Sequence, residues 1–182
     1  MADISLEKTL PHNLEAERSI LGAVLLDEQA LHTVFETVKA QDFYLEGHRR
    51  VFEKMLQLMD NSRPIDLITL KEELQRAGEL ESTGGAAYLA GLTDGLPRAL
   101  NIGHYARIVK EKSTLRRLIQ VSSETMSRSY RDEDPTEEIL QSAEKAIYDI
   151  SNAQFRSGFT PIPPIVSDVY ADIEKLSHHK AT

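Results

Sequence analysis

Apolar residues recur at intervals of three and four along most of this chain, which is the spacing of amphipathic helices. No segment keeps up an alternation of apolar and polar residues, so the pattern predicts an all-α fold. The longest helical pattern runs from Ala99 to about Tyr130 and contains one helix breaker, Gly103. A second run, from Pro135 to Phe155, follows a short acidic turn. The two runs predict a long antiparallel helical hairpin over residues 99–156.

Residues 1–98 predict a globular helical head that precedes the hairpin. Its helices are expected at about residues 14–26, 28–38, 46–59, 66–77 and 85–92. Asn13 is the expected N-cap of the first helix. That helix is apolar nearly all round from Ile20 to Leu26, so we expect it to be the buried central helix of the head.

Two helix starts in the head carry distinctive residues. The fourth helix can begin at Asp66, or at Thr69 with a capping box to Glu72. Gly84-Gly85 precedes the last helix of the head and is a weak candidate for a phosphate loop, because no strand comes before it. We interpret the pair as a helix start that needs residues without Cβ.

Each hairpin helix carries an apolar stripe, and we expect these stripes to mediate self-association while part of them holds the hairpin together. The candidate self-association residues are Tyr105, Ile108, Leu115, Ile119, Met126, Ile139 and Ile147. Asp134 as N-cap and Pro135 at the first helical position predict the start of the second helix. Basic residues gather on the first helix and acidic ones on the second. Antiparallel pairing can set Lys110, Lys112, Arg116 and Arg117 of the first helix against Glu137, Glu138, Glu144 and Asp149 of the second.

The C-terminal part of the chain predicts a linker and one more helix. Residues 157–164 are rich in proline and predict a stiff, extended linker. Residues 165–182 predict a linker helix, which alone would be marginal in water at about 15 residues. We expect its apolar stripe to dock on another domain or chain. The docking candidates are Ile165, Val169, Tyr170, Ile173 and Leu176.

Composition narrows the class of protein. The chain has no cysteine, which excludes disulfides, thiolate zinc sites and cysteine nucleophiles and suits a reducing cytoplasm. Its longest uncharged apolar run, Ile20 to Leu26, is far shorter than the roughly 20 residues that span a bilayer, so no membrane contact is expected. The net charge of −8 makes this segment a poor direct binder of nucleic acid, because phosphate contacts need clustered Lys and Arg.

No residue pattern predicts catalysis or metal binding, so we assign no catalytic, cofactor-binding or metal residue. The sequence contains no Walker A loop, no H-E-x-x-H and no G-x-S-x-G. The acidic run Asp132-Glu133-Asp134 is interpreted as a solvated turn. We interpret as solvated surface residues the six histidines, which are His12, His32, His48, His104, His178 and His179. This segment alone is not expected to be an enzyme.

A set of short motifs, in order and over nearly the whole chain, resembles a known family. The motifs are Pro11-His12-Asn13-Leu14-Glu15-Ala16-Glu17, Leu21-Gly22, Asp42-Phe43-Tyr44 with His48, Pro64-Ile65-Asp66-Leu67-Ile68-Thr69-Leu70, Gly84-Gly85-Ala86-Ala87-Tyr88-Leu89, Asn101-Ile102, Tyr105-Ala106-Arg107-Ile108-Val109 and Arg116-Arg117-Leu118-Ile119. Their order and spacing are similar to the N-terminal domain of bacterial replicative DNA helicases of the DnaB type.

The resemblance implies an all-α domain that is followed by a linker helix and a RecA-like ATPase domain. That ATPase domain would hold ATP and magnesium, and because this sequence stops at Thr182 we expect a segment without the motor. The implied role is that of a cytoplasmic collar at the replication fork. Such domains form dimers, trimers of dimers and a hexamer, and they bind primase and the helicase loader.

Aromatic and methionine side chains are favoured anchors at interfaces, which suggests primase-binding candidates. These are Tyr88, Met126 and Tyr130. For Tyr88 the alternative is a core position beneath the Gly84-Gly85 turn. For the whole chain there are two alternatives. The first is a free-standing helical adaptor without a motor domain, and the second, ranked below it, is an unrelated small enzyme.

Overall fold

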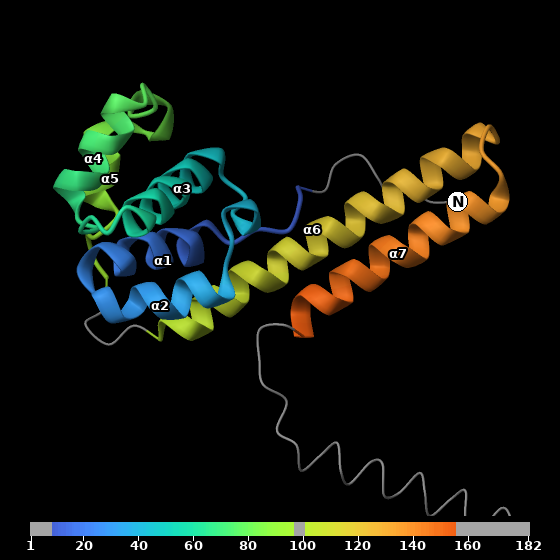
Figure 1. Cartoon of the computed structure of the whole chain (residues 1–182), viewed down its shortest axis with the longest axis horizontal. Coiled ribbons are helices and arrows are strands. Elements are labelled where there is room, and N and C mark those ends of the chain that lie inside the picture. Colours follow the sequence, from blue (N-terminus) through green and yellow to red (C-terminus); the bar gives the residue numbers. More distant parts are fainter. Residues whose placement is uncertain (1–8, 97–100, 156–182) are drawn as a thin grey trace, which may run out of the picture. The chain divides into compact units, whose positions relative to one another are not determined.

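The computed structural model describes residues 9–96 and 101–155, and these contain helices and no β-strand (Figure 1). The all-α prediction is confirmed. The α-helices are α1 (Leu14–Leu26), α2 (Glu28–Thr37), α3 (Glu46–Asp60), α4 (Leu67–Arg76), α5 (Gly85–Gly91), α6 (Ile102–Arg131) and α7 (Thr136–Phe155), with short 3₁₀ helices η1 (Ala40–Asp42) and η2 (Glu81–Thr83). The chain divides into two compact units after Ile150.

The core of the head is built around α1, which contacts α2, α3 and α6. Ile20 and Leu21 of α1 are fully buried, as are Val51 and Phe52 of α3. The predicted N-cap is confirmed, because the side-chain oxygen of Asn13 accepts a hydrogen bond from the backbone N–H of Ala16 at 2.9 Å. The apolar run in α1 therefore forms the central helix that its pattern predicts.

Gly22 lets α1 and the end of α5 approach closely. A Cβ at this position would overlap the backbone carbonyl of Leu92 and the side chain of Leu96. Only a residue without a side chain fits such a backbone contact. The Leu21-Gly22 motif is thus a packing requirement between α1 and the segment that follows α5.

The structure shows how α4 and α5 begin. Helix α4 begins after Asp66, whose carboxylate accepts hydrogen bonds from the N–H groups of Ile68 (2.9 Å) and Thr69 (2.8 Å). The Thr69 hydroxyl accepts in return from the Asp66 N–H, so the capping box is Asp66 with Thr69, not Thr69 with Glu72. Gly84 and Gly85 adopt φ of +101° and +75°, which confirms the need for residues without Cβ.

The hairpin helices begin and end close to their predicted limits. Helix α6 is capped by Asn101, and Asp132 ends it in the left-handed region. Helix α7 begins one residue later than predicted, because the Pro135 carbonyl accepts the first bonds, from the N–H groups of Glu138 and Ile139. The prediction of Asp134 as N-cap is therefore wrong. Its carboxylate accepts from Arg128 Nε at 2.8 Å instead.

The domain limits at residues 98 and 156 fall outside the described residues and stay a prediction. The same holds for the linker at 157–164 and the linker helix at 165–182.

The packing at Gly22 predicts that Gly22→Ala destabilises the head by about 1–3 kcal/mol, because a methyl group would be forced against the Leu92 carbonyl. The matched control is Gly47→Ala in α3, where an added Cβ meets only ordinary contacts with Thr83. Alanine there should be neutral or stabilising by up to about 1 kcal/mol. Urea unfolding followed by circular dichroism measures both, and equal stabilities of the two variants would contradict the packing argument.

The cap at Asp66 predicts that Asp66→Ala costs about 1 kcal/mol at neutral pH, whereas Asp66→Asn costs less, because Asn also caps helices. The hydrogen bond from the Thr69 N–H lowers the pKa of Asp66. A lowered folded-state pKa means that the cap stabilises at neutral pH and is lost as the pH falls through that pKa. Wild type should therefore lose its advantage over Asp66→Asn below about pH 4. Thermal unfolding across pH would show a constant difference if the cap were not ionised.

Candidate protein-interaction site

The first half of α6 belongs to the head. Ala106 and Val109 are buried in the head core, and Tyr105 and Ile108 are partly buried against it. Two of the predicted self-association residues, Tyr105 and Ile108, therefore pack within their own chain. Their exposed edges alone are open to a partner.

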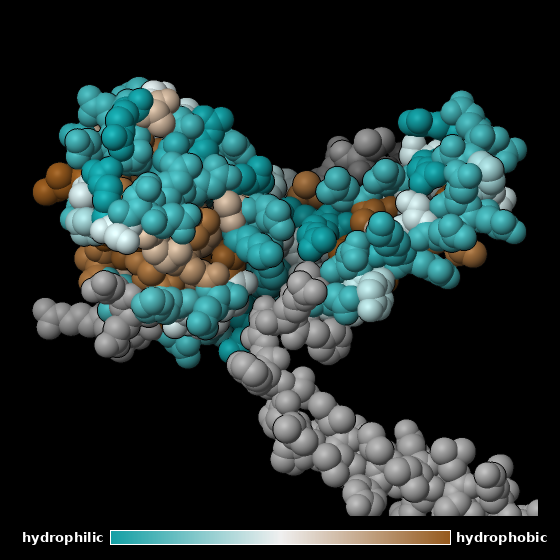
Figure 2. All heavy atoms as spheres, in the orientation of Figure 1, coloured by the Kyte–Doolittle hydropathy of each residue, from teal (hydrophilic) through white to brown (hydrophobic). Residues whose placement is uncertain are grey.

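The second half of α6 presents apolar side chains to solvent. Leu115, Leu118, Ile119 and Met126 are exposed, with exposed fractions of 42% for Ile119 and 53% for Met126. Tyr130, near the C-terminal end of α6, is 84% exposed. Figure 2 shows brown, hydrophobic residues among teal, hydrophilic ones along the hairpin.

Helix α7 adds to this apolar surface. Leu140, Ile147 and Tyr148 are exposed, Ile139 is half-buried and Ile150 is buried. Figure 1 shows α7 running back along α6 in the opposite direction. Of the predicted self-association residues, the structure thus leaves open Leu115, Ile119, Met126 and Ile147, with Ile139 half open. We call the exposed residues on the two helices, Leu115, Leu118, Ile119, Met126, Tyr130, Leu140, Ile147 and Tyr148, the hairpin surface.

The expected opposition of charges between the two hairpin helices is wrong for Lys110 and Arg116. Lys110 Nζ lies 2.7 Å from Asp42 Oδ2 in the head. Arg116 donates to the carbonyls of Pro11 and Asp42. Both side chains point to the head because buried acceptors there need donors more than exposed acids on α7 do.

Tyr88 belongs to a hydrogen-bonded chain inside the head. Glu17 accepts from the N–H of Tyr44 (2.7 Å) and from His48 Nδ1 (2.8 Å), and His48 Nε2 bonds the Tyr88 hydroxyl. Glu17 and His48 are each 1% exposed, so the interpretation of His48 as a surface residue is wrong. The Tyr88 ring is half-buried over Gly84, which leaves less of it for a partner than the sequence suggests.

Sequence reasoning missed this network, although a signal for it exists. Glu17 stands three, four and seven residues before Ile20, Leu21 and Val24, which is the buried stripe of α1. His48 has the same spacing from the buried residues of α3, which are Val51, Phe52 and Met55. A polar residue at a core position of a helical stripe predicts a buried polar partner.

The hydrogen bonds of Glu17, His48 and Tyr88 connect α1, α3 and α5 inside the head. Burial raises the pKa of the Tyr88 phenol, with Glu17 adding to the rise and Arg18 opposing it. A raised pKa keeps the hydroxyl protonated, which is the opposite of what a nucleophile needs. Within the described ranges, no three His, Asp or Glu side chains are grouped to hold a metal ion.

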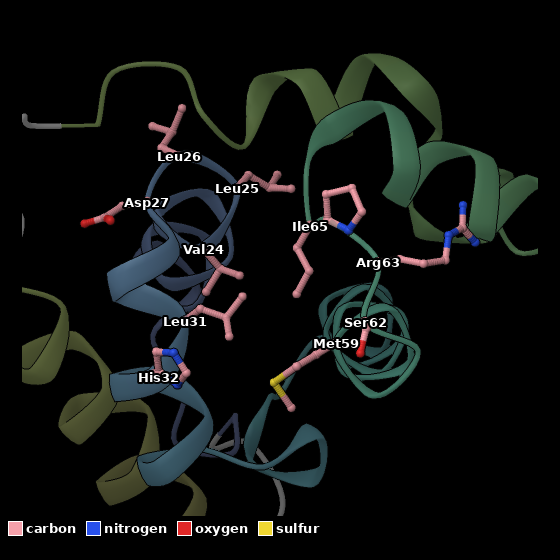
Figure 3. A pocket seen from close by; sticks show the side chains of 11 residues that line it. Val24, Leu25, Leu26, Asp27, Leu31, His32, Met59, Ser62, Arg63 and Ile65 are labelled. Atoms are coloured by element: carbon pink, nitrogen blue, oxygen red, sulfur yellow. The ribbon is translucent and has the colours of Figure 1, made fainter.

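A groove of about 490 Å³ opens on the head between α1, α2 and the turn after α3. Figure 3 shows Val24, Leu25, Leu31, Met59 and Ile65 facing this space, while Asp27 and Arg63 point away. His32 and Ser62 also line the groove, but most of its lining is apolar and offers packing area. Among the helices of the described residues, none is long and apolar enough to cross a bilayer.

The linker-helix docking candidates, Ile165 to Leu176, lie outside the described residues.

Comparison with known proteins confirms the resemblance drawn from the motifs. Residues 9–111 match the family model of the DnaB-like helicase N terminal domain. The replicative DNA helicase DnaB of Geobacillus stearothermophilus is 38% identical over 176 residues, which is 97% of this chain and 39% of that protein. The replicative DNA helicase DnaC of Bacillus subtilis (strain 168) is 37% identical over 180 residues, 99% of this chain and 40% of that protein. The chain thus spans about two fifths of these relatives.

Solved structures of DnaB-type helicases have the same fold as this chain. The N-terminal domain of DnaB helicase from Mycobacterium tuberculosis is 37% identical with a TM-score of 0.73, covering 78% of this chain and 99% of that one. A DnaB-like replicative helicase whose structure is described with its interactions with primase has a TM-score of 0.65 at 20% identity, covering 90% of this chain and 36% of that one, which shows the fold alone. Because the family match covers more than half of its residues, this chain belongs to the DnaB-like helicase N terminal domain family.

Proposed function

We propose that this chain is the collar domain of a bacterial replicative DNA helicase, with the hairpin surface as its assembly site. The observation that carries the proposal is an apolar surface on α6 and α7, in a chain of the DnaB-like helicase N terminal domain family. In the parent protein a following ATPase domain would bind ATP and magnesium and unwind DNA in the cytoplasm. This segment supplies contacts and no chemistry.

The distribution of exposed apolar residues supports self-association through the hairpin. Among the described residues, eight of the thirteen exposed large apolar side chains belong to the hairpin surface. Exposed apolar side chains gathered on two neighbouring helices support an interaction site there. A surface on two antiparallel helices can pair with its own copy about a two-fold axis, which gives a dimer. Three such dimers, joined by a second contact, give the hexameric ring expected of the parent helicase.

Primase and the helicase loader are the partners we propose for this collar. A structural neighbour with the same fold is described with its interactions with primase. Tyr130 and Met126 supply an exposed aromatic ring and a flexible thioether near the C-terminal end of α6. Side chains of these types bury much area at modest entropic cost. Tyr88 contributes the exposed part of its ring, while its hydroxyl is engaged with His48.

We also propose that the stripe from Ile165 to Leu176 docks on a neighbouring ATPase domain. This rests on its helical spacing in the sequence and on the low stability of an isolated helix.

Self-association through the hairpin surface predicts that Ile119→Glu weakens the dimer by at least about tenfold in Kd, because a carboxylate would be desolvated in an apolar contact. The control is Gln120→Glu, which adds the same charge at the neighbouring exposed position. Analytical ultracentrifugation of the 182-residue chain measures association, and circular dichroism checks helix content. A folded Ile119→Glu chain that associates like wild type would remove Ile119 from the interface.

Primase binding at the end of α6 predicts that Tyr130→Ala or Met126→Ala lowers the affinity for a primase C-terminal domain by about fivefold or more, the range in which interface truncations become significant. Tyr148→Ala is the control, since Tyr148 is an exposed tyrosine of α7. Calorimetric titration measures the affinity, on samples whose self-association matches wild type. Unchanged affinity in both variants would place primase elsewhere on the collar.

A further inference from the structure

The contacts between α6 and the head change in kind along the helix. Up to Val109 they are apolar, because Ala106 and Val109 lie in the head core. Beyond Val109, three polar side chains of α6 form hydrogen bonds with the head, those of Lys110, Ser113 and Arg116. All three reach Asp42 or the chain beside it. We call these three residues together with Asp42 the Asp42 clamp.

The Asp42 carboxylate is buried and fully engaged. It is 1% exposed, and its oxygens accept hydrogen bonds from Lys39 N–H (2.8 Å), Lys110 Nζ (2.7 Å) and Ser113 Oγ (2.7 Å). A buried carboxylate is tolerated only when donors surround it, so each donor is held in a defined place. Two of the three donors come from α6, on successive turns of the helix.

Arg116 extends the clamp by one more turn. Its guanidinium donates to the Pro11 carbonyl at 2.8 Å and to the Asp42 carbonyl, and it lies over the Tyr44 ring at 5.6 Å from the ring centre. His12 stacks on Tyr44, with ring centres 4.3 Å apart. The side chain therefore joins α6 to two separate segments of the head, one before α1 and one after η1.

These polar contacts differ from the apolar ones in being directional. The hydrophobic effect is non-directional, whereas hydrogen bonds weaken steeply when their angles change. The 15 residues from Arg117 to Arg131 extend for about 22 Å at 1.5 Å per residue, so a tilt of about 10° at Arg116 would move their far end by about 4 Å. A small error at the clamp would misplace the whole hairpin surface.

We propose that the Asp42 clamp fixes the direction in which α6 leaves the head, and that Asp42, Lys110, Ser113 and Arg116 are positioning residues for assembly. The clamp holds the hairpin surface of one copy at the angle that a second copy requires. The consequence for assembly rests on the proposed self-association of the hairpin, whereas the fixed direction is a property of the single chain.

The absence of cysteine allows a direct measurement of this direction. Spin labels at Glu53→Cys in α3 and Ser127→Cys in α6 report the distance between head and hairpin, since both positions are exposed. Labelled chains are diluted with unlabelled ones so that only distances within one chain are read. The reference pair, Glu53→Cys with Gln75→Cys, lies within the head.

The variant Ser113→Ala combined with Lys110→Met keeps the apolar contacts of α6 and removes both α6 donors to the Asp42 carboxylate. We expect its head-to-hairpin distance distribution to broaden roughly twofold, because the helix then populates more orientations. The head pair should stay unchanged. Ser123→Ala, the same substitution at an exposed position of α6, is the matched control and should behave as wild type.

A distribution of unchanged width in the double variant, with helix content preserved, would overturn the proposal. Arg116→Lys keeps the charge but loses the planar two-point contact, so it tests the same idea without touching the buried carboxylate. If the double variant unfolds, a normal width in Arg116→Lys would overturn the proposal and a broadened width would support it. Because the distances are intramolecular, a chain that does not self-associate would contradict the proposed function and leave this measurement decisive.

Discussion

Burying the Asp42 carboxylate is the constraint on which the arrangement of α6 depends. A charged group inside a protein is costly unless donors replace its water. Here the donors come from the η1 backbone and from two successive turns of α6, so satisfying the charge also fixes where α6 lies. An apolar residue at position 42 would pack without demanding any particular partner. The carboxylate instead demands donors in a defined geometry, which fits the assembly role proposed for the hairpin surface.

A second buried carboxylate organises the head in the same way. Glu17 of α1 accepts from the backbone at Tyr44 and from His48 of α3, and His48 reaches Tyr88 of α5. The three helices are thus tied by polar contacts as well as by the core. Several of the motifs that carry the family resemblance contribute residues to these two networks, among them Glu17, Asp42, His48, Tyr88 and Arg116. In these motifs the residues hold the fold together.

The sequence predicted most helix limits, but it did not predict which residues far apart in the chain form hydrogen bonds. The cap at Asn13 and the limits of α6 depend on residues within a few positions, so local patterns were enough to find them. The same patterns left two possible starts for α4 and placed the cap of α7 one residue too early. The partners of Lys110 and Arg116 lie 68 and 105 residues away in the sequence, at Asp42 and Pro11. Surface charge pattern suggested the nearer helix α7 instead. The burial of Asp42 determines where these side chains bind, and that burial depends on tertiary packing, which the local sequence pattern does not reveal.

The apolar stripe of α6 shows why spacing alone cannot say what covers a helix face. Tyr105 and Ile108 continue in register into Leu115 and Ile119, so the pattern reads as one seam. The structure divides that seam at the Asp42 clamp, with the head covering its first part and its second part left exposed. The same helix is therefore a core element over its first part and carries the proposed interface on its second part. Helix α6 is continuous from Ile102 to Arg131, so one rigid element joins the head core to the exposed part of the stripe.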